Sequence, residues 1–209
     1  MSTAIYQIAI GKNNISANVA MKTIPEAERE AVEAQMMASL DELGVTRILS
    51  CNSAWADEEH PWWVVLRFPS LEARMEHVRI TKKIGWLDMV DAFTLLGTST
   101  DEFHEVTYPD AIYKLWLLRT NPAGALTNDS RPKGLTDLMW EKHNAVYKEN
   151  NSQGLLFCNS YWCNEAYPAF GVSAYPNIEA NMRVMETLDG LGWRRNLDCF
   201  SLLGTSAGS

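Results

Sequence analysis

One twenty-residue stretch decides the fold because it occurs twice: CNSAWADEEHPWWVVLRFPS at 51–70 and CNSYWCNEAYPAFGVSAYPN at 158–177. The two copies lie 107 positions apart. At that offset residues 51–99 align with residues 158–206 without a gap, and 20 of the 49 pairs are identical. The same offset pairs AIY at Ala4 with AIY at Ala111. Such self-similarity indicates two copies of one structural unit. We assign 1–99 to the first repeat, 100–110 to a linker and 111–209 to the second repeat.

The order of secondary-structure elements can be read from the first repeat. Alternating apolar residues predict strands, and longer amphipathic segments that begin near Pro25 and Ser70 and end at Gly44 and Gly85 predict helices. The order is β-α-β-β-α-β, which is the ferredoxin-like motif. The expected elements are strand 4–10, helix 23–44, strands 46–53 and 62–68, helix 70–85 and strand 89–98.

The predicted fold class is α+β. In a ferredoxin-like unit the helices cover one face of an antiparallel sheet and leave the other face bare, and a bare apolar face has to be buried. A second copy in the same chain can bury it. We therefore predict two ferredoxin-like βαββαβ repeats packed sheet to sheet as an intramolecular dimeric α/β barrel.

The stretch PWWVVLRFPSLEARMEHV at 61–78 resembles a known superfamily. Its aromatic strand, Pro-Ser turn, Glu72-Ala73 pair and His77 are similar to those of dimeric α/β-barrel proteins of the antibiotic-biosynthesis monooxygenase type. That superfamily includes cofactor-free oxygenases, polyketide cyclases, decarboxylases, lactone isomerases and haem enzymes, so the fold does not choose among them. The resemblance implies an acid/base or haem-ligand role for His77. A solvent-facing helical histidine is the alternative, and the second copy has Val184 there.

Comparison of the two copies also predicts which face of each sheet lines a cavity. We expect strand positions that are apolar in both copies to face their own helices. Positions that differ should face an interior that the repeats share. The expected cavity is asymmetric and mostly apolar, plugged by Trp62 and Leu66 and open near Gly171 and Ser173, as ligand pockets often are.

The candidate catalytic residues are His77, His143, Asp91, Asp198 and Lys114. An inward carboxylate in an apolar cavity would have a raised pKa and could act as a general base, although both Asp residues could instead cap loops in solvent. Lys114 or the two Asn residues could stabilise an anion, but an Asn at a strand end is also typical of a turn. The candidate substrate-binding residues are Asn52, Asn159, Trp62, Trp116, Ser173 and Tyr175.

Three functions remain open. The leading hypothesis is a cofactor-independent enzyme that deprotonates a small hydrophobic, aromatic or polyketide-like molecule to an enolate or phenolate, followed by oxygenation, cyclisation or decarboxylation. The second is a haem-binding protein or haem enzyme with His77 or His143 as the axial ligand. The third is a non-catalytic binding or assembly module.

Composition and charge limit the classes of molecule that the protein is expected to bind. The net charge of −8 and scattered Lys and Arg residues disfavour nucleic acid. No apolar run is long enough for a membrane span, and the N-terminus has no secretory signal pattern. No His, Cys or carboxylate spacing predicts a metal site. We expect a cytoplasmic protein with four free thiols, and a homodimer remains open; the cysteines are Cys51, Cys158, Cys163 and Cys199.

Overall fold

The computed structural model describes residues 4–12, 23–106, 108–121, 135–193 and 197–207. The chain divides into two compact units. The first comprises Met1–Thr100 with Ala207–Ser209, and the second comprises Asp101–Ser206. The segment that we expected to be a linker therefore groups with the second unit from Asp101 onward.

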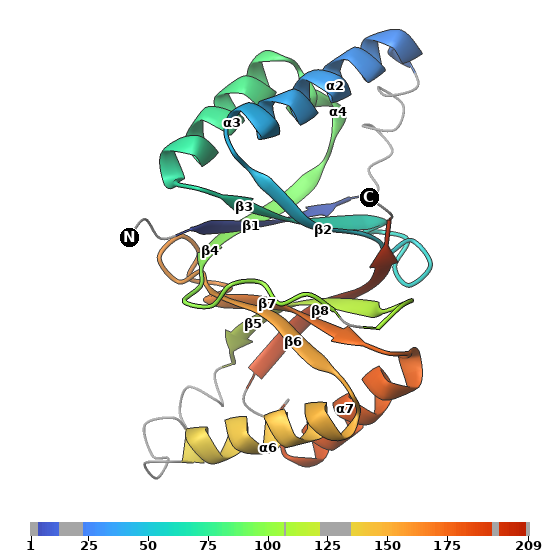
Figure 1. Ribbon diagram of the computed structural model, residues 1–209, viewed down its shortest axis with the longest axis vertical. Coiled ribbons are helices and arrows are strands. Elements are labelled where there is room, and N and C mark those ends of the chain that lie inside the picture. Colours follow the sequence, from blue (N-terminus) through green and yellow to red (C-terminus); the bar gives the residue numbers. More distant parts are fainter. Residues whose placement is uncertain (1–3, 13–22, 107, 122–134, 194–196, 208–209) are drawn as a thin grey trace. The chain divides into compact units, whose positions relative to one another are not determined.

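In the first unit two long helices cover one face of a four-stranded antiparallel sheet (Figure 1). Strand β1 pairs with β3 and with β4, and β2 pairs with β3, so the strand order is β4-β1-β3-β2. This is the ferredoxin-like order. The elements are β1 (Ile5–Gly11), α2 (Glu26–Glu42), β2 (Thr46–Asn52), β3 (Trp62–Phe68), α3 (Leu71–Lys83), α4 (Trp86–Met89) and β4 (Ala92–Thr98).

The second unit repeats this arrangement. Strand β5 pairs with β7 and β8, and β6 pairs with β7, again all antiparallel. The register shifts between Gly154 and Leu156 in β6, at the position that corresponds to the shift between Arg47 and Leu49 in β2. The elements are β5 (Ile112–Thr120), α6 (Leu135–Glu149), β6 (Gln153–Asn159), β7 (Ala169–Tyr175), α7 (Ile178–Gly190) and β8 (Leu197–Ser206).

Matched caps start the second helix of each unit directly after a strand. The Ser70 hydroxyl accepts the Ala73 N–H at 3.2 Å, and the Asn177 side chain accepts the Ala180 N–H at 2.8 Å. Such caps satisfy N–H groups that lack partners within the helix. The expected strand from residue 89 begins three residues later, because Gly85, with φ +78°, opens the short helix α4 instead.

The predicted assignment of the sheet faces is wrong, because the faces are reversed. The residues that are apolar in both copies point away from the helices, and nearly all are buried, as Ile8, Trp63 and Leu115 are. The residues that differ point toward the helices: Leu66 and Phe68 pack with Leu40 of α2. The helix residues differ between the two copies. The strand residues that pack against the helices therefore differ as well, and these are the variable strand positions.

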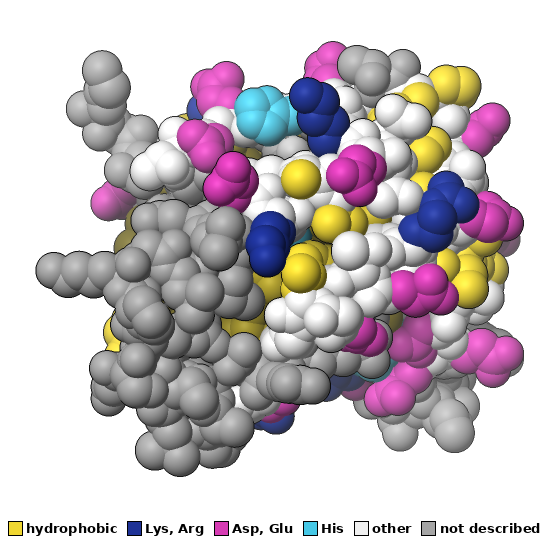
Figure 2. Space-filling model, turned by 90° about the horizontal axis from the view of Figure 1, so that it is seen from below, with side chains coloured by type: hydrophobic (Ala, Val, Ile, Leu, Met, Phe, Trp, Pro, Cys, Tyr) yellow, Lys and Arg dark blue, Asp and Glu magenta, His cyan; other side chains and the backbone are white. Residues whose placement is uncertain are grey.

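The outer surface is acidic. On the face shown in Figure 2, Lys and Arg side chains lie apart from one another among more frequent Asp and Glu side chains. This pattern agrees with the net charge of −8. Within the described ranges, no helix is both long and apolar enough to cross a membrane.

Candidate functional site

His77 is a buried titratable residue on the helix-facing side of the first unit. It lies in the middle of α3, and its side chain is only 7% exposed. The ring contacts Phe68 of β3, with the ring centroids 5.6 Å apart. The solvent-facing alternative for His77 is therefore wrong. Residues of both sheet and helices enclose the imidazole.

The hydrogen bonds of Ser39 determine the His77 tautomer. The Ser39 hydroxyl donates to the Met36 carbonyl at 2.7 Å, and its oxygen lies 3.3 Å from His77 Nδ1. With its one hydroxyl proton directed to Met36 at the shorter distance, Ser39 accepts from His77, which favours the tautomer with the ring proton on Nδ1. This leaves a lone pair on Nε2, the arrangement of a histidine that ligates a metal.

His77 is neutral at physiological pH. Burial, and secondarily the positive charge of Arg74, lower its pKa from 6.5 to about 4. A low dielectric disfavours the imidazolium, and the nearby cation disfavours it further. The lone pair on Nε2 is therefore available across the physiological range.

A cavity of about 610 Å³ opens beside His77 between the sheet and the helices of the first unit. Its size falls within the range of about 300–1,000 Å³ that is usual for ligand pockets. The walls are largely apolar, with polar groups only at a few positions. The lining includes Gln7, Met36, Arg47, Trp62, Arg74 and Trp86.

Two polar groups of this cavity lack hydrogen-bond partners among the described residues. They are Nε and Nη1 of Arg74 and Oε1 of Gln7. Burial lowers the pKa of Arg74, and its guanidinium lies 5.7 Å from the centre of the Phe68 ring. Buried polar groups are nearly always hydrogen-bonded in folded proteins, so such an exception indicates a place for a bound molecule or water.

A smaller cavity, of about 220 Å³, occupies the corresponding place in the second unit. Lys114 and Trp116 reach it from β5, and His143 and Tyr147 reach it from α6. The region near Gly171, which we predicted to be open, is instead filled. A Cβ on Gly171 would lie 2.2 Å from the Trp116 ring, so that ring occupies the space above the glycine.

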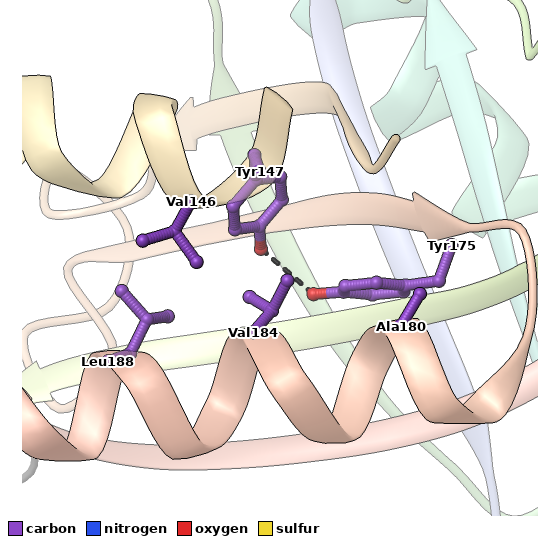
Figure 3. Close-up of a cluster of buried hydrophobic side chains, with 6 residues drawn as sticks. All are labelled: Val146, Tyr147, Tyr175, Ala180, Val184 and Leu188. Atoms are coloured by element: carbon purple, nitrogen blue, oxygen red, sulfur yellow. Dashed lines mark hydrogen bonds between the residues drawn. The ribbon is translucent and has the colours of Figure 1, made fainter. Parts of the chain in front are cut away.

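Hydrogen bonds connect the polar residues beside the second cavity. Trp116 Nε1–H donates to Ser173 Oγ at 3.1 Å, and the Tyr147 hydroxyl lies 3.1 Å from the same oxygen. Tyr147 also bonds Tyr175, with the two hydroxyl oxygens 2.9 Å apart (Figure 3). Burial raises the pKa of both tyrosines, so they stay protonated at neutral pH.

Lys114 and His143 complete the second cavity. The Lys114 side chain is 6% exposed, and its Nζ lies 2.8 Å from the Met185 sulfur. The His143 ring stacks on Trp193 at 5.4 Å, and Nδ1 lies 3.3 Å from Oδ1 of Asn144. Burial lowers the pKa of His143.

Five predicted site residues line neither cavity. They are Asp91, Asp198, Asn52, Asn159 and Tyr175, which bonds the cavity residue Tyr147. Asp198 does not point inward as expected. It is partly exposed and pairs with Arg119 Nε at 3.1 Å. Asp91 precedes β4 and does not line the first cavity. The side chains of Asn52 and Asn159 accept the N–H groups of Ala54 and Tyr161 in matched turns, which is the structural alternative for both.

Several residues that line the first cavity or contact His77 were not predicted, although the sequence carries a signal for them. Each has a chemically different residue at the aligned position, as Arg74 and Asn181, Ser39 and Val146, or Thr81 and Leu188 do. Comparing helix positions as well as strand positions would have found this set. The described residues contain no cluster of three or more His, Cys, Asp or Glu suited to a metal ion.

Similarity to other proteins is structural. No family model matches the sequence, and no curated protein matches it. A mutant chlorite dismutase from Candidatus Nitrospira defluvii matches with a TM-score of 0.77 at 8% identity, over 100% of this chain and 93% of that one. The imidazole complex of a chlorite dismutase from the same organism matches with a TM-score of 0.74 at 10% identity, over 99% and 92%.

A third structure, of a protein provisionally named a chlorite dismutase, matches with a TM-score of 0.69 at 12% identity, over 99% of this chain and 96% of that one. Chlorite dismutases belong to the dimeric α/β-barrel superfamily. The likeness confirms the predicted fold class, an α+β chain of the dimeric α/β-barrel type.

The comparisons correct the leading functional hypothesis. Chlorite dismutases contain haem. This contradicts the prediction of a cofactor-independent acid/base enzyme and of no cofactor. The antibiotic-biosynthesis monooxygenase resemblance is not confirmed beyond the fold.

Proposed function

We propose that the protein binds haem in the cavity of the first unit, with His77 as the axial ligand. The observation that carries this proposal is the neutral His77 side chain, with its proton on Nδ1, beside a cavity of about 610 Å³. Neutral imidazole is a common axial ligand of haem iron. The whole-chain likeness to haem-containing chlorite dismutases supports the same class of ligand.

The other residues of the cavity suit the remaining parts of a haem. Trp62 and Trp86 offer flat apolar surfaces for the porphyrin, and Met36 offers an adaptable one. The unpaired nitrogens of Arg74, with Arg47 nearby in the lining, suit the two carboxylates of haem. Guanidinium groups bind carboxylates through charge-assisted hydrogen bonds.

Neighbouring residues set the properties of His77 as a ligand of the iron. Ser39 accepts the Nδ1 proton, which fixes the orientation of the ring and makes Nε2 a better donor. Burial keeps the imidazole unprotonated. The apolar walls restrict water. Bound haem would supply iron for binding small ligands or for transferring an electron.

The second unit suits haem less well. Its cavity of about 220 Å³ lies below the usual range for ligands of that size, and the His143 ring is stacked between Trp193 and Tyr147. We therefore assign the axial ligand to His77 and keep His143 as the alternative that the experiment tests.

The test is a haemin titration of the full-length apo-protein, followed by absorption and electron paramagnetic resonance spectra. Wild type should give a saturable shift of the Soret band at one equivalent. His77→Ala should lose that axial-ligand signature. His143→Ala should keep it, as should the control His60→Ala, because His60 lies in a loop and pairs with Asp57. An unchanged His77→Ala spectrum would overturn the assignment to His77. A wild type without any saturable shift would overturn haem binding.

A further inference from the structure

We propose that the cavity of the second unit is a separate binding site for a single-ring aromatic monocarboxylate. The geometry that points to this ligand is a small cavity, open to solvent on one side, with flat aromatic walls and a buried lysine, Lys114. This inference does not depend on haem binding, because the cavity lies entirely within the second unit.

The size of the cavity limits the ligand to one ring. Its volume of about 220 Å³ exceeds the roughly 150 Å³ of an engineered cavity that binds benzene. It is smaller than the roughly 300 Å³ at which ordinary ligand pockets begin. One aromatic ring with one compact substituent fits between these limits.

The walls are flat and held in place. The Trp116 ring is fixed at one end by its bond to Ser173 and packs over the bare backbone of Gly171. The Trp193 indole, stacked with His143 at an interplanar angle of 23°, provides a second flat surface. Rigid aromatic walls favour a planar ligand, because ring pairs gain energy in stacked or tilted contacts.

Lys114 sets the charge of the ligand. Its Nζ lies in the low-dielectric interior, where a protonated lysine attracts a carboxylate more strongly than in water, and a bound carboxylate would in turn favour the protonated form. Tyr147 lines the same cavity and stays protonated, and its hydroxyl proton is available to a ligand when Ser173 and Tyr175 donate their own protons to it. Together they form a site for one negatively charged oxygen group.

The polar residues of this site are particular to the second copy. At the positions of Tyr147, Ser173 and Tyr175 the first copy has Leu40, Leu66 and Phe68. The position of Lys114 has an uncharged Gln7. Where the first copy has three apolar residues and one uncharged residue, the second has a bonded polar group and a lysine between the sheet and helix α6, which a purely structural role does not require.

Two carboxylates explain why the ligand should carry a single charge. Asp101 and Glu102 also line the cavity, and their side chains are exposed. A second negative group on the ligand, at the solvent end, would approach them and be repelled. A monocarboxylate with its charge toward Lys114 avoids this contact.

Benzoate is the probe, with affinity measured by calorimetry on the full chain. Wild type should bind benzoate, and benzylamine and phthalate should bind at least about tenfold more weakly, since a charge-assisted hydrogen bond contributes about 1.5–3 kcal/mol. Lys114→Met, which keeps the length of the side chain, should lose about tenfold or more. Lys148→Met, on the exposed side of α6, should bind as wild type does.

Two further measurements locate the site. Gly154→Leu should weaken benzoate binding while the protein stays folded, because Gly154 lines the cavity and a Cβ there meets no atom within 4 Å. Protein saturated with haemin should bind benzoate as tightly as apo-protein. The proposal is overturned if wild type does not bind benzoate, if Lys114→Met binds it equally well, if benzylamine binds as tightly as benzoate, or if haemin displaces it.

Discussion

The Ser39 hydroxyl of α2 and the His77 imidazole of α3 lie 3.3 Å apart, from Oγ to Nδ1, on the helix-facing side of the first sheet. This contact determines which nitrogen of His77 carries the proton. Ser39→Ala should therefore weaken haem binding by about tenfold or more, in line with other residues that orient a metal ligand. A haemin titration measures this, with Ser50→Ala, at a serine that lines the cavity but is not in contact with His77, as the control. Equal affinities for Ser39→Ala and wild type would contradict the role of Ser39.

Stability should depend on pH through His77. Its pKa is about 4 in the folded protein and 6.5 as the ordinary value, so the unfolded state binds more protons between these pH values. The contribution to stability is therefore complete above pH 6.5 and is lost as the pH falls toward 4, by at most about 3 kcal/mol. Denaturant unfolding at several pH values measures it. His77→Val, the residue of the other copy, should show a flatter profile than wild type, and His60→Ala should not.

Arg74 should have opposite effects on stability and on binding. Its guanidinium is partly buried with Nε and Nη1 unpaired among the described residues, which costs free energy in the apo-protein. Arg74→Met keeps most of the apolar stem and should leave the unfolding free energy of apo-protein unchanged or higher, while haem affinity falls.

The same variant should raise the His77 pKa, because the Arg74 charge lowers it. An NMR titration of His77 measures this shift. Arg79→Met, at an exposed arginine that pairs with Glu76, is the control and should change neither affinity nor the His77 pKa. A marked loss of apo-protein stability in Arg74→Met would show that Arg74 serves packing rather than ligand binding.

Gly171 should tolerate no side chain. A Cβ there would lie 2.2 Å from the Trp116 ring and 2.4 Å from the backbone oxygen of Leu156, which has no freedom to move aside. Gly171→Val, which introduces the residue of the first copy, should destabilise the protein by about 1–3 kcal/mol or more. Gly154→Ala, with open space around its Cβ, should be close to neutral. Chemical denaturation compares the two, and equal stabilities would contradict the packing described for Trp116.

The hydroxyl of Tyr147 should stabilise the second unit. Tyr147→Phe removes its bonds to Ser173 and Tyr175 and leaves two buried hydroxyls with fewer partners. We expect a loss of about 1–3 kcal/mol, against almost none for Tyr161→Phe, at a 62% exposed tyrosine. A double-mutant cycle with Tyr175→Phe should give a coupling of about 0.5 kcal/mol or more. Strict additivity would mean that the pair is not energetically linked.

The sequence predicted the fold well because the repeat supplies its own internal comparison. The order of helices and strands along the chain followed from hydrophobic period, and the helix start at Ser70 followed from its capping side chain. The short helix α4 was missed because Gly85 was taken as a simple stop, whereas its left-handed conformation starts a further turn.

The candidate site was predicted only in part. His77 was predicted from the resemblance to the superfamily. Trp62, Trp116 and Lys114 were predicted because the aligned position in the other copy has a different residue. The helix-facing side of each sheet was assigned wrongly because both sides of the strands are apolar and look alike in sequence. Only the contacts of Phe68 and Tyr175 with helix residues distinguish the two sides. Arg74 and Ser39 were missed because polar residues in an amphipathic helix usually face solvent.

The position of the cavities has a consequence for how this protein can change. Each cavity is walled by the sheet and helices of a single unit. A substitution that reshapes one therefore demands no compensating substitution in the other. Doubling an ancestral gene in this way yields one polypeptide with two compartments whose selectivities can drift, or be engineered, one at a time.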